Sequence, residues 1–278
     1  MLWSVNVCSS VNIKMNSLVH STERVGKTVL EITEGWGNAW IFLWHTIRAI
    51  FTPPLRIHLI LQQIYEIGFN STFVIALIGV FTGAVLAVQG EYTLAKFGAT
   101  AFTGSAVALS LIRELGPVLT ALMVIGRAGS AITAEVGIMR ITEQIDALKS
   151  MAVDPIKYLM APRLIAGIIA VPFLTAIFIT IGILGGYLVG VGLLGLSSGT
   201  FLSQMEAAVS MTDVASGMIK SVVFGFIFGW VSCYKGYTCG FGAVGVNRAT
   251  TQSVVIASVS VLVIDYFLTS ILTRIFFE

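Results

Sequence analysis

The sequence predicts an all-α polytopic membrane protein: an N-terminal interfacial amphipathic helix, five transmembrane helices and one short cytoplasmic helix. Two observations predict this class. Of the 278 residues, 56% are hydrophobic and only 11% are charged, whereas a soluble domain carries about 25% charged residues. The charge-free runs are also long enough to cross a bilayer, which takes roughly 20 apolar residues. A soluble enzyme and a disordered chain are therefore excluded, and a net charge of +2 gives no field for holding nucleic acid.

The domain organisation follows from the absence of a polar linker after the first residues. We expect an N-terminal extension over residues 1–30 and a single membrane domain over residues 31–278. Within that domain, Trp40, Leu43, Trp44, Ile47, Ile50 and Phe51 share a face with Trp36 at the helical angle of about 100° per residue. Pro53 and Pro54 end this segment. An amphipathic, Trp-rich helix beside a span is typical of one that lies in the headgroup plane.

Five spans are predicted from hydropathy and charge. They are Ile67 to Gly90, Phe97 to Ala134, Leu164 to about Leu194, Val214 to Tyr234 and Ala249 to Thr273. The second span carries Gly116-Pro117, where the missing proline N–H favours a break. The run from Leu164 to Met205 has no charge and is long enough for two spans.

The distribution of Lys and Arg decides how this run is counted, because cytoplasmic loops are rich in these residues. Arg140, Lys149 and Lys157 precede the run, and Lys235 and Arg248 follow the next span. Only one span in the run puts both groups in the cytoplasm, with a short outer segment after it. The N-terminus is then cytoplasmic and the C-terminus lies on the outer side.

Ionisable residues inside the spans are the main candidates for function, since a charge at the bilayer centre costs about 2.5–3.5 kcal/mol on insertion scales. Arg113 and Glu114 lie in the second span, and Lys220 and Asp265 lie in the fourth and fifth. Arg113 and Glu114 indicate either a polar spot in a substrate cavity or a structural ion pair. For Lys220 and Asp265 we favour a structural pair across helices.

The other motifs do not predict chemistry. Gly26-Lys27-Thr28 ends like a phosphate-binding loop, but Ser21 stands where that loop needs glycine. The cysteines and histidines show no metal or catalytic spacing, so we expect no catalytic residue, no metal site and no cofactor in this chain. Glycines four residues apart, such as Gly79 and Gly83 or Gly225 and Gly229, predict close helix packing within or between subunits.

The cytoplasmic stretch from Gly137 to Pro162 is amphipathic. Ile141, Ile145 and Leu148 are expected to share one helical face, and Asp154-Pro155 is expected to stop the helix. This helix is either a simple connection or a docking element for a soluble partner.

The same region resembles the MlaE/YrbE-like permeases, the membrane subunits of Mla-type ABC phospholipid transporters. The resemblance rests on RELGPV, GRAGSAITAE, EQIDAL, AVDP and PR, which follow in that order between Ala108 and Leu164. Milder agreement extends over about residues 65–275, including Asn247-Arg248-Ala249-Thr250-Thr251.

The resemblance implies a homodimeric permease in the inner membrane of a diderm bacterium that moves phospholipids between inner and outer membranes. It implies two cytoplasmic ATPases that hold the ATP and Mg, a periplasmic ring of MCE-domain proteins and a small STAS-domain protein. It also implies two sets of site residues. The coupling helix that contacts the ATPase would comprise Glu143, Gln144, Ile145, Asp146, Ala147 and Leu148, and the lipid cavity at the dimer centre Gln89, Leu94, Phe97, Arg113 and Glu114.

Two other functions remain open at this stage. A secondary transporter driven by an ion gradient would use Arg113, Glu114, Lys220 and Asp265 as a relay, although no inverted repeat supports it. A membrane scaffold would have no cavity at all. The lipid class and the direction of transport are not predicted by any residue pattern.

Overall fold

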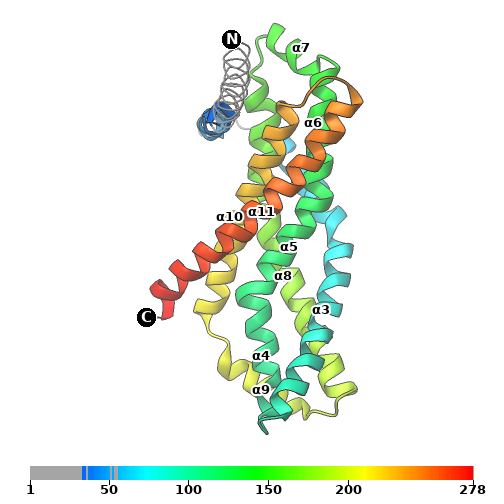
Figure 1. Ribbon diagram of the computed structural model, residues 1–278, viewed down its shortest axis with the longest axis vertical. Coiled ribbons are helices and arrows are strands. Elements are labelled where there is room, and N and C mark those ends of the chain that lie inside the picture. The colour runs from blue at the N-terminus through cyan, green and yellow to red at the C-terminus, as the bar shows by residue number, and fades with distance from the viewer. Residues whose placement is uncertain (1–32, 36, 51, 53–55, 278) are drawn as a thin grey trace, which may run out of the picture. The chain divides into compact units, whose positions relative to one another are not determined.

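The structure is a computed structural model that describes residues 33–35, 37–50, 52 and 56–277. The chain divides into two compact units, Met1–Arg48 and Ala49–Glu278. The described residues are almost entirely helical and contain no strand. Figure 1 shows the second unit as a bundle of long helices, with the short helices α7 and α9 at its opposite ends.

The predicted amphipathic segment is helical over residues 33–35 and 37–50. Phe42 and Leu43 are buried, whereas Trp40 and Trp44 are largely exposed. The predicted extension over residues 1–30, and Trp36, Phe51, Pro53 and Pro54, lie outside the described residues. The headgroup location of this helix stays a prediction.

The prediction of five membrane-length helices is confirmed for the described chain. Each is somewhat longer than the apolar run that predicted it, because helical hydrogen bonding continues into the polar flanks. The first comprises α2 (Ile57–Ile64), η1 (Tyr65–Phe69) and α3 (Asn70–Ala95). The second runs from η2 (Thr100–Phe102) through α4 (Thr103–Ser110), η3 (Leu111–Leu115), α5 (Gly116–Val124) and η4 (Ile125–Gly129) to α6 (Ser130–Ile141). The third is η5 (Ile156–Met160) with α8 (Ala161–Gly192), and the last two are α10 (Met211–Tyr237) and α11 (Gly242–Phe277).

The long uncharged run contains one span, as the charge distribution predicted. Helix α8 ends at Gly192, and a separate short helix, α9 (Ser198–Ala208), follows it. Gly195 lies between them with a φ of 70°, a left-handed conformation that glycine adopts without steric cost. The turn at Gly195 therefore separates the span from the short segment that follows it.

The predicted break at Gly116-Pro117 is instead a widened turn in a continuous helix. Residues Leu111–Leu115 form a π-helical turn, and the N–H of Gly116 donates to the carbonyl of Leu111 five residues earlier. A π turn is one of the ways in which a helix accommodates a disturbed hydrogen-bond pattern. The second span therefore stays intact past Pro117, and Arg113 and Glu114 sit on its widened turn.

Glycines allow the close packing of α3, α8 and α10, as their spacing predicted. A Cβ on Gly83 would overlap the carbonyl oxygen of Gly182 on α8. A Cβ on Gly225 of α10 would come 2.5 Å from the carbonyl oxygen of Gly167 on α8. These glycines pack helices within one chain, in the manner of small-residue contacts between membrane helices.

The stretch that was predicted to be cytoplasmic differs from the predicted helix. Helix α6 ends at Ile141 and α7 (Gln144–Ser150) begins after Glu143, which has a φ of 59°. Ile141 therefore does not share a helical face with Ile145 and Leu148, although Ile145 is fully buried. The reason is local: a left-handed residue cannot continue a right-handed helix.

The other end of α7 also differs from the prediction. Helix α7 ends in a Schellman turn in which the N–H of Val153 donates to the carbonyl of Leu148, with Ala152 at a φ of 59°. Asp154-Pro155 begins the next helix instead of stopping this one. The carboxylate of Asp154 accepts the N–H of Ile156 at 2.9 Å, and proline is well suited to a first helical position.

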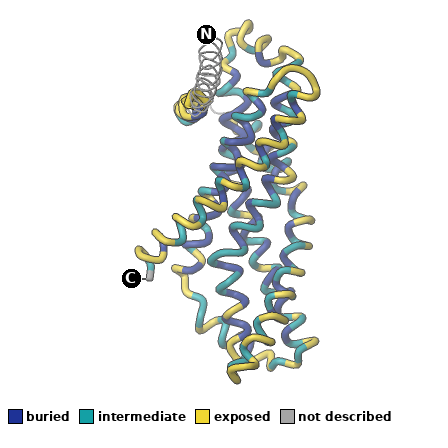
Figure 2. Tube along the Cα trace, viewed as in Figure 1, coloured by how far each residue is buried: buried dark blue, intermediate teal, exposed yellow. Residues whose placement is uncertain are grey.

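Burial is uneven among the spans. The most hydrophobic window of α10 is 56% buried within the chain, whereas that of α11 is only 11% buried. Figure 2 shows exposed residues along much of α11. Helix α10 is thus the most buried of the five spans, and α11 presents a broad apolar face outward.

Candidate functional site

A charged pocket lies where the second span meets α10 and α11. The widened turn η3 supplies Arg113 and Glu114, and the facing residues come from α10 and α11. The pocket has a volume of about 380 Å³. Its lining residues are Leu109, Ser110, Arg113, Glu114, Ser216, Lys220, Thr269, Leu272 and Thr273.

Lys220 is the centre of the inner half of this site. Its Nζ donates to Oε2 of Glu114 at 2.6 Å and to Oγ1 of Thr269 at 2.7 Å. It also lies 3.2 Å from Oδ1 of Asp265, an ion-pair distance without hydrogen-bond geometry. Only 2% of the Lys220 side chain is exposed. The predicted pairing of Lys220 with Asp265 is therefore confirmed, and Glu114 is the closer partner.

A further contact of Lys220 explains how the helix tolerates Pro117. Proline has no N–H for the carbonyl four residues earlier, which here belongs to Arg113. Lys220 Nζ donates to that carbonyl at 3.1 Å. The lysine thus ties the disturbed turn of the second span to α10.

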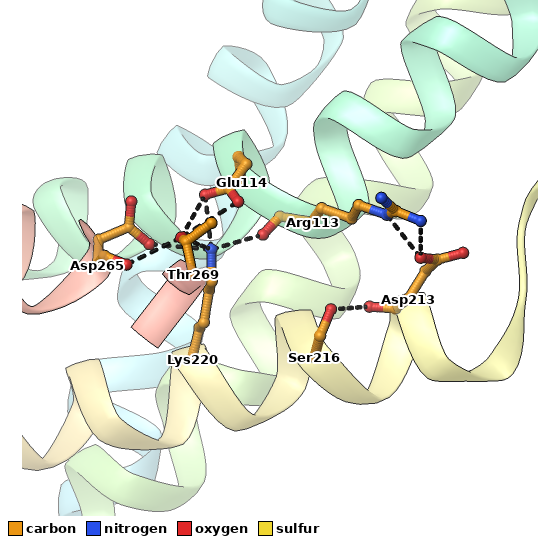
Figure 3. A network of polar contacts seen from close by, with 7 residues as sticks. All are labelled: Arg113, Glu114, Asp213, Ser216, Lys220, Asp265 and Thr269. Carbon is orange, nitrogen blue, oxygen red and sulfur yellow. Dashed lines mark hydrogen bonds and ion pairs between the residues drawn. The ribbon is translucent and has the colours of Figure 1, made fainter. Parts of the chain in front are cut away.

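Arg113 forms the outer half of the site with Asp213. The Nε and Nη2 atoms of Arg113 lie 2.6 and 2.5 Å from Oδ1 of Asp213. Oδ2 of the same carboxylate accepts the backbone N–H and the hydroxyl of Ser210 at 2.8 and 2.7 Å. Figure 3 shows the Arg113 side chain extending away from Glu114 and toward Asp213.

The two pairs differ in what they present to the pocket. The side chains of Arg113 and Glu114 are 39% and 41% exposed, whereas those of Asp213 and Lys220 are 1% and 2% exposed. The wall of the pocket therefore offers one cation and one anion, each with its counter-ion buried behind it. Such a surface can bind a polar or charged group of a ligand inside the membrane. Among the described residues, no group of three His, Cys, Asp or Glu side chains could hold a metal ion.

The residues predicted for the lipid cavity fall in two places. Arg113 and Glu114 line the charged pocket, but Gln89 lines a separate, mostly apolar groove of about 510 Å³ between α3 and α8. Leu94 is half-buried near the end of α3, and Phe97, just beyond it, is 79% exposed. A cavity shared by all five residues at the centre of a homodimer stays a prediction.

Sequence reasoning missed Asp213 and Thr269. Asp213 was assigned to the outer segment because it follows a run without Lys or Arg. The available signal was the Ser210-Met211-Thr212-Asp213 pattern, which forms a capping box at the start of α10. No sequence signal marks Thr269, a hydroxyl residue in an apolar helix.

The residues predicted to contact an ATPase lie on α7 and its first cap. Ile145 is buried and Leu148 is half-buried, while Glu143, Gln144, Asp146 and Ala147 are exposed. Lys149 Nζ donates to Oδ1 of Asp146 at 2.9 Å, and this bond lowers the pKa of the Asp146 carboxyl from its usual value. Helix α7 is therefore anchored by Ile145 and presents a polar outer face.

Five membrane-length helices, three of which line a charged pocket, define a polytopic membrane protein. The chain belongs to the MlaE permease family: the family model described as "Permease MlaE" matches residues 60–271.

Individual relatives agree with this assignment. The intermembrane phospholipid transport system permease protein MlaE of Haemophilus influenzae is 44% identical over 92% of this chain and 98% of its own length. A probable ABC transporter permease protein of Rickettsia felis is 44% identical over 93% of this chain and all of its own length. The chloroplastic protein Trigalactosyldiacylglycerol 1 of Arabidopsis thaliana is 38% identical over 76% of this chain and 60% of its own length.

Proposed function

We propose that this protein is the permease subunit of an ATP-driven ABC transporter that moves phospholipids between the inner and outer membranes. The observation that carries the proposal is the charged pocket of this chain, which belongs to the MlaE permease family. In this pocket Arg113 and Glu114 are exposed inside the membrane. Ionisable side chains at this depth are costly unless they pair or serve a polar substrate. The name of the Haemophilus relative supports phospholipid as that substrate.

The proposed binding mode follows from the chemistry of the two regions. The lipid phosphate meets Arg113, and the acyl chains lie along Leu94 and Phe97 near Gln89, in a cavity at the centre of a homodimer. The largely exposed apolar face of α11 leaves room for contact with a second copy. A dimer would bring the charged pocket and the apolar groove of the two chains into one cavity.

The proposed partner for energy is a cytoplasmic ABC ATPase dimer that holds the ATP and Mg. Helix α7 supports this, because it is exposed and is bracketed by the left-handed residues Glu143 and Ala152. A short helix set off by two turns and anchored by one buried side chain can dock in a groove of a partner and transmit its movement. The present chain then acts as a non-catalytic subunit.

The proposed location is the inner membrane of a diderm bacterium, with the N-terminus in the cytoplasm and the C-terminus in the periplasm. The cluster of Arg140, Lys149 and Lys157 beside α7 supports this orientation. A periplasmic ring of MCE-domain proteins and a STAS-domain protein complete the proposed assembly.

The test of the energy-coupling part is a charge reversal on α7. The double variant Glu143→Lys and Asp146→Lys is purified with the ATPase, and co-purification and lipid-stimulated ATP turnover are measured. We expect both to be lost while the melting temperature is unchanged. Glu91→Lys with Glu206→Lys is the matched control, since it makes the same change in charge at the opposite end of the molecule. An ATPase that still co-purifies with the α7 variant would refute the docking role.

The test of the substrate is native mass spectrometry of the purified protein. We expect bound phospholipid in the wild type and its loss in Arg113→Gln. Wild-type protein that carries no lipid would instead favour a scaffold without a cavity.

The second candidate function is a secondary transporter of a lipid or hydrophobic solute driven by an ion gradient. The contiguous set of Glu114, Lys220 and Asp265 favours it, because adjacent titratable groups can pass a proton. Reconstituted protein without any ATPase distinguishes the two functions. Transport that follows a pH gradient supports the second candidate, and transport that requires ATPase and ATP supports the first.

A further inference from the structure

Helix α10 meets the adjacent residues Arg113 and Glu114 with charges of opposite sign. Asp213 and Lys220 are seven residues apart, which is two helical turns or about 10 Å along the axis. Arg113 reaches the outer of these positions and Glu114 the inner one. Two side chains that are neighbours in sequence are thereby drawn in opposite directions (Figure 3).

We propose that Asp213 is a positioning residue for substrate binding: it holds the guanidinium of Arg113 at the outer end of the pocket, away from Glu114, where it receives the phosphate of a phospholipid. This inference rests on the proposed function and deepens it, because it assigns a role to a residue outside the pocket lining.

The fixed geometry of Asp213 supports the proposal. Both of its oxygens are engaged: Oδ1 by Arg113, and Oδ2 by the backbone and hydroxyl of Ser210. The carboxylate is 1% exposed, so it does not itself contact a ligand in the pocket. An ionised buried carboxylate keeps its partner, because losing it would leave an uncompensated charge. Arg113 is thus held in one direction while its side chain, which is 39% exposed, lines the pocket.

Loss of this anchor gives Arg113 another acid. The carboxylate of Glu114 belongs to the next residue and is 41% exposed. A guanidinium released from Asp213 would turn toward Glu114, and the two exposed charges would neutralise each other across the pocket. Removing Asp213 also removes a negative charge that opposes phosphate, an effect of opposite sign. We expect position to dominate, because bidentate binding of phosphate by arginine depends on its geometry.

The experiment compares two lipids with the same acyl chains. Purified full-length protein in detergent is titrated with a phosphatidylglycerol and with the matched diacylglycerol, which lacks the phosphate. We expect Asp213→Asn to weaken phosphatidylglycerol binding about tenfold, near the lower end of what a hydrogen bond to a charged group contributes. Diacylglycerol binding should not change. A merely structural role would weaken both lipids equally.

Three further variants sharpen the experiment. Arg113→Gln should show the same selective loss, and Arg113→Gln with Asp213→Asn should show no additional loss, because the two residues act as one unit. Glu206→Gln removes an exposed charge from α9 and should bind both lipids like the wild type. Ser210→Ala keeps every charge and removes only one of the hydrogen bonds that hold the Asp213 carboxylate, so a smaller selective loss of about two- to threefold is expected.

The outcomes separate this inference from the proposed function. If the wild type binds phosphatidylglycerol and Asp213→Asn binds it as tightly or more tightly, the positioning role alone is overturned. If Asp213→Asn does not fold, Ser210→Ala decides, and wild-type affinity in that variant overturns the role. A wild type that binds neither lipid overturns the proposed function and this inference with it.

Discussion

Charged side chains occur in two regions with opposite surroundings, the intramembrane pocket and the short helix α7. In the pocket, Arg113 pairs with Asp213 and Glu114 with Lys220, across about a hundred positions of sequence, and one member of each pair is almost fully buried. At α7, Asp146 pairs with Lys149 three residues away, and both are about half exposed.

The difference shows that similar ion pairs carry different consequences. Exposed pairs contribute little to stability. Breaking a buried pair leaves a charge without compensation and is strongly destabilising. We therefore expect substitutions in the pocket to act on folding and lipid binding together, and those at α7 to act on partner binding alone.

The largest expected effect is that of Lys220→Met. It leaves Glu114 and Asp265 without their shared cation and frees the carbonyl of Arg113. We expect the free energy of unfolding in detergent to fall by about 3–5 kcal/mol. Adding Glu114→Gln and Asp265→Asn should restore much of it, because no charge is then unpaired. If Lys220→Met lowers the free energy of unfolding by less than about 1 kcal/mol, these buried ion pairs contribute no more to stability than exposed pairs do.

The next effect concerns Arg163, a second buried cation, which pairs with Glu135 at 2.8 Å and is 5% exposed. Glu135→Gln should lower the free energy of unfolding by about 1–3 kcal/mol, the cost of leaving a buried donor poorly satisfied. Thermal unfolding of the purified protein measures it. Arg140, which lies 3.6 Å from Asp146 and is 37% exposed, supplies the control: Arg140→Gln should leave the melting temperature unchanged.

At α7, backbone geometry should matter more than charge. Ala152 occupies the left-handed position of the Schellman turn with a φ of 59°, which costs a residue other than glycine roughly 1–2 kcal/mol. Ala152→Gly should stabilise the turn by up to about 1 kcal/mol. The gain is smaller than the relieved strain because glycine loses more conformational freedom on folding than alanine does. Slower hydrogen exchange of the Val153 amide measures this. Faster exchange would show that the turn is not strained.

The smallest effect is that of Lys149→Met. Asp146 has a lowered pKa, chiefly through its hydrogen bond with Lys149 and then through the charges of Lys149 and Arg140. A lowered carboxyl pKa stabilises the folded state at a pH above the usual pKa of 3.8. This contribution is lost as the pH falls through the lowered pKa. Lys149→Met should move the pKa of Asp146 back toward 3.8. Carbon-13 titration of aspartate-labelled protein measures the shift, and the melting temperature at neutral pH should not change.

Features that depend on neighbouring residues were predicted well from the sequence. Arg113, Glu114, Lys220 and Asp265 were singled out because each is a charge in an apolar run, and the predicted pairing of Lys220 with Asp265 is observed. The turns around α7 were missed, since nothing in Glu143 or Ala152 favours a left-handed conformation. The Asp154-Pro155 pair was assigned to the wrong helix, because the same two residues can end one helix or begin the next.

The sequence by itself determined the number of spans, their expected orientation and the family, since hydropathy, loop charge and motif order are local properties of the chain. Only the tertiary structure decided that Arg113 pairs with Asp213 and that Lys220 serves Glu114, Asp265 and the carbonyl freed by Pro117. The physical reason is distance along the chain. The choice among several acids and cations is made by helix packing, to which glycine contacts such as Gly225 against Gly167 contribute.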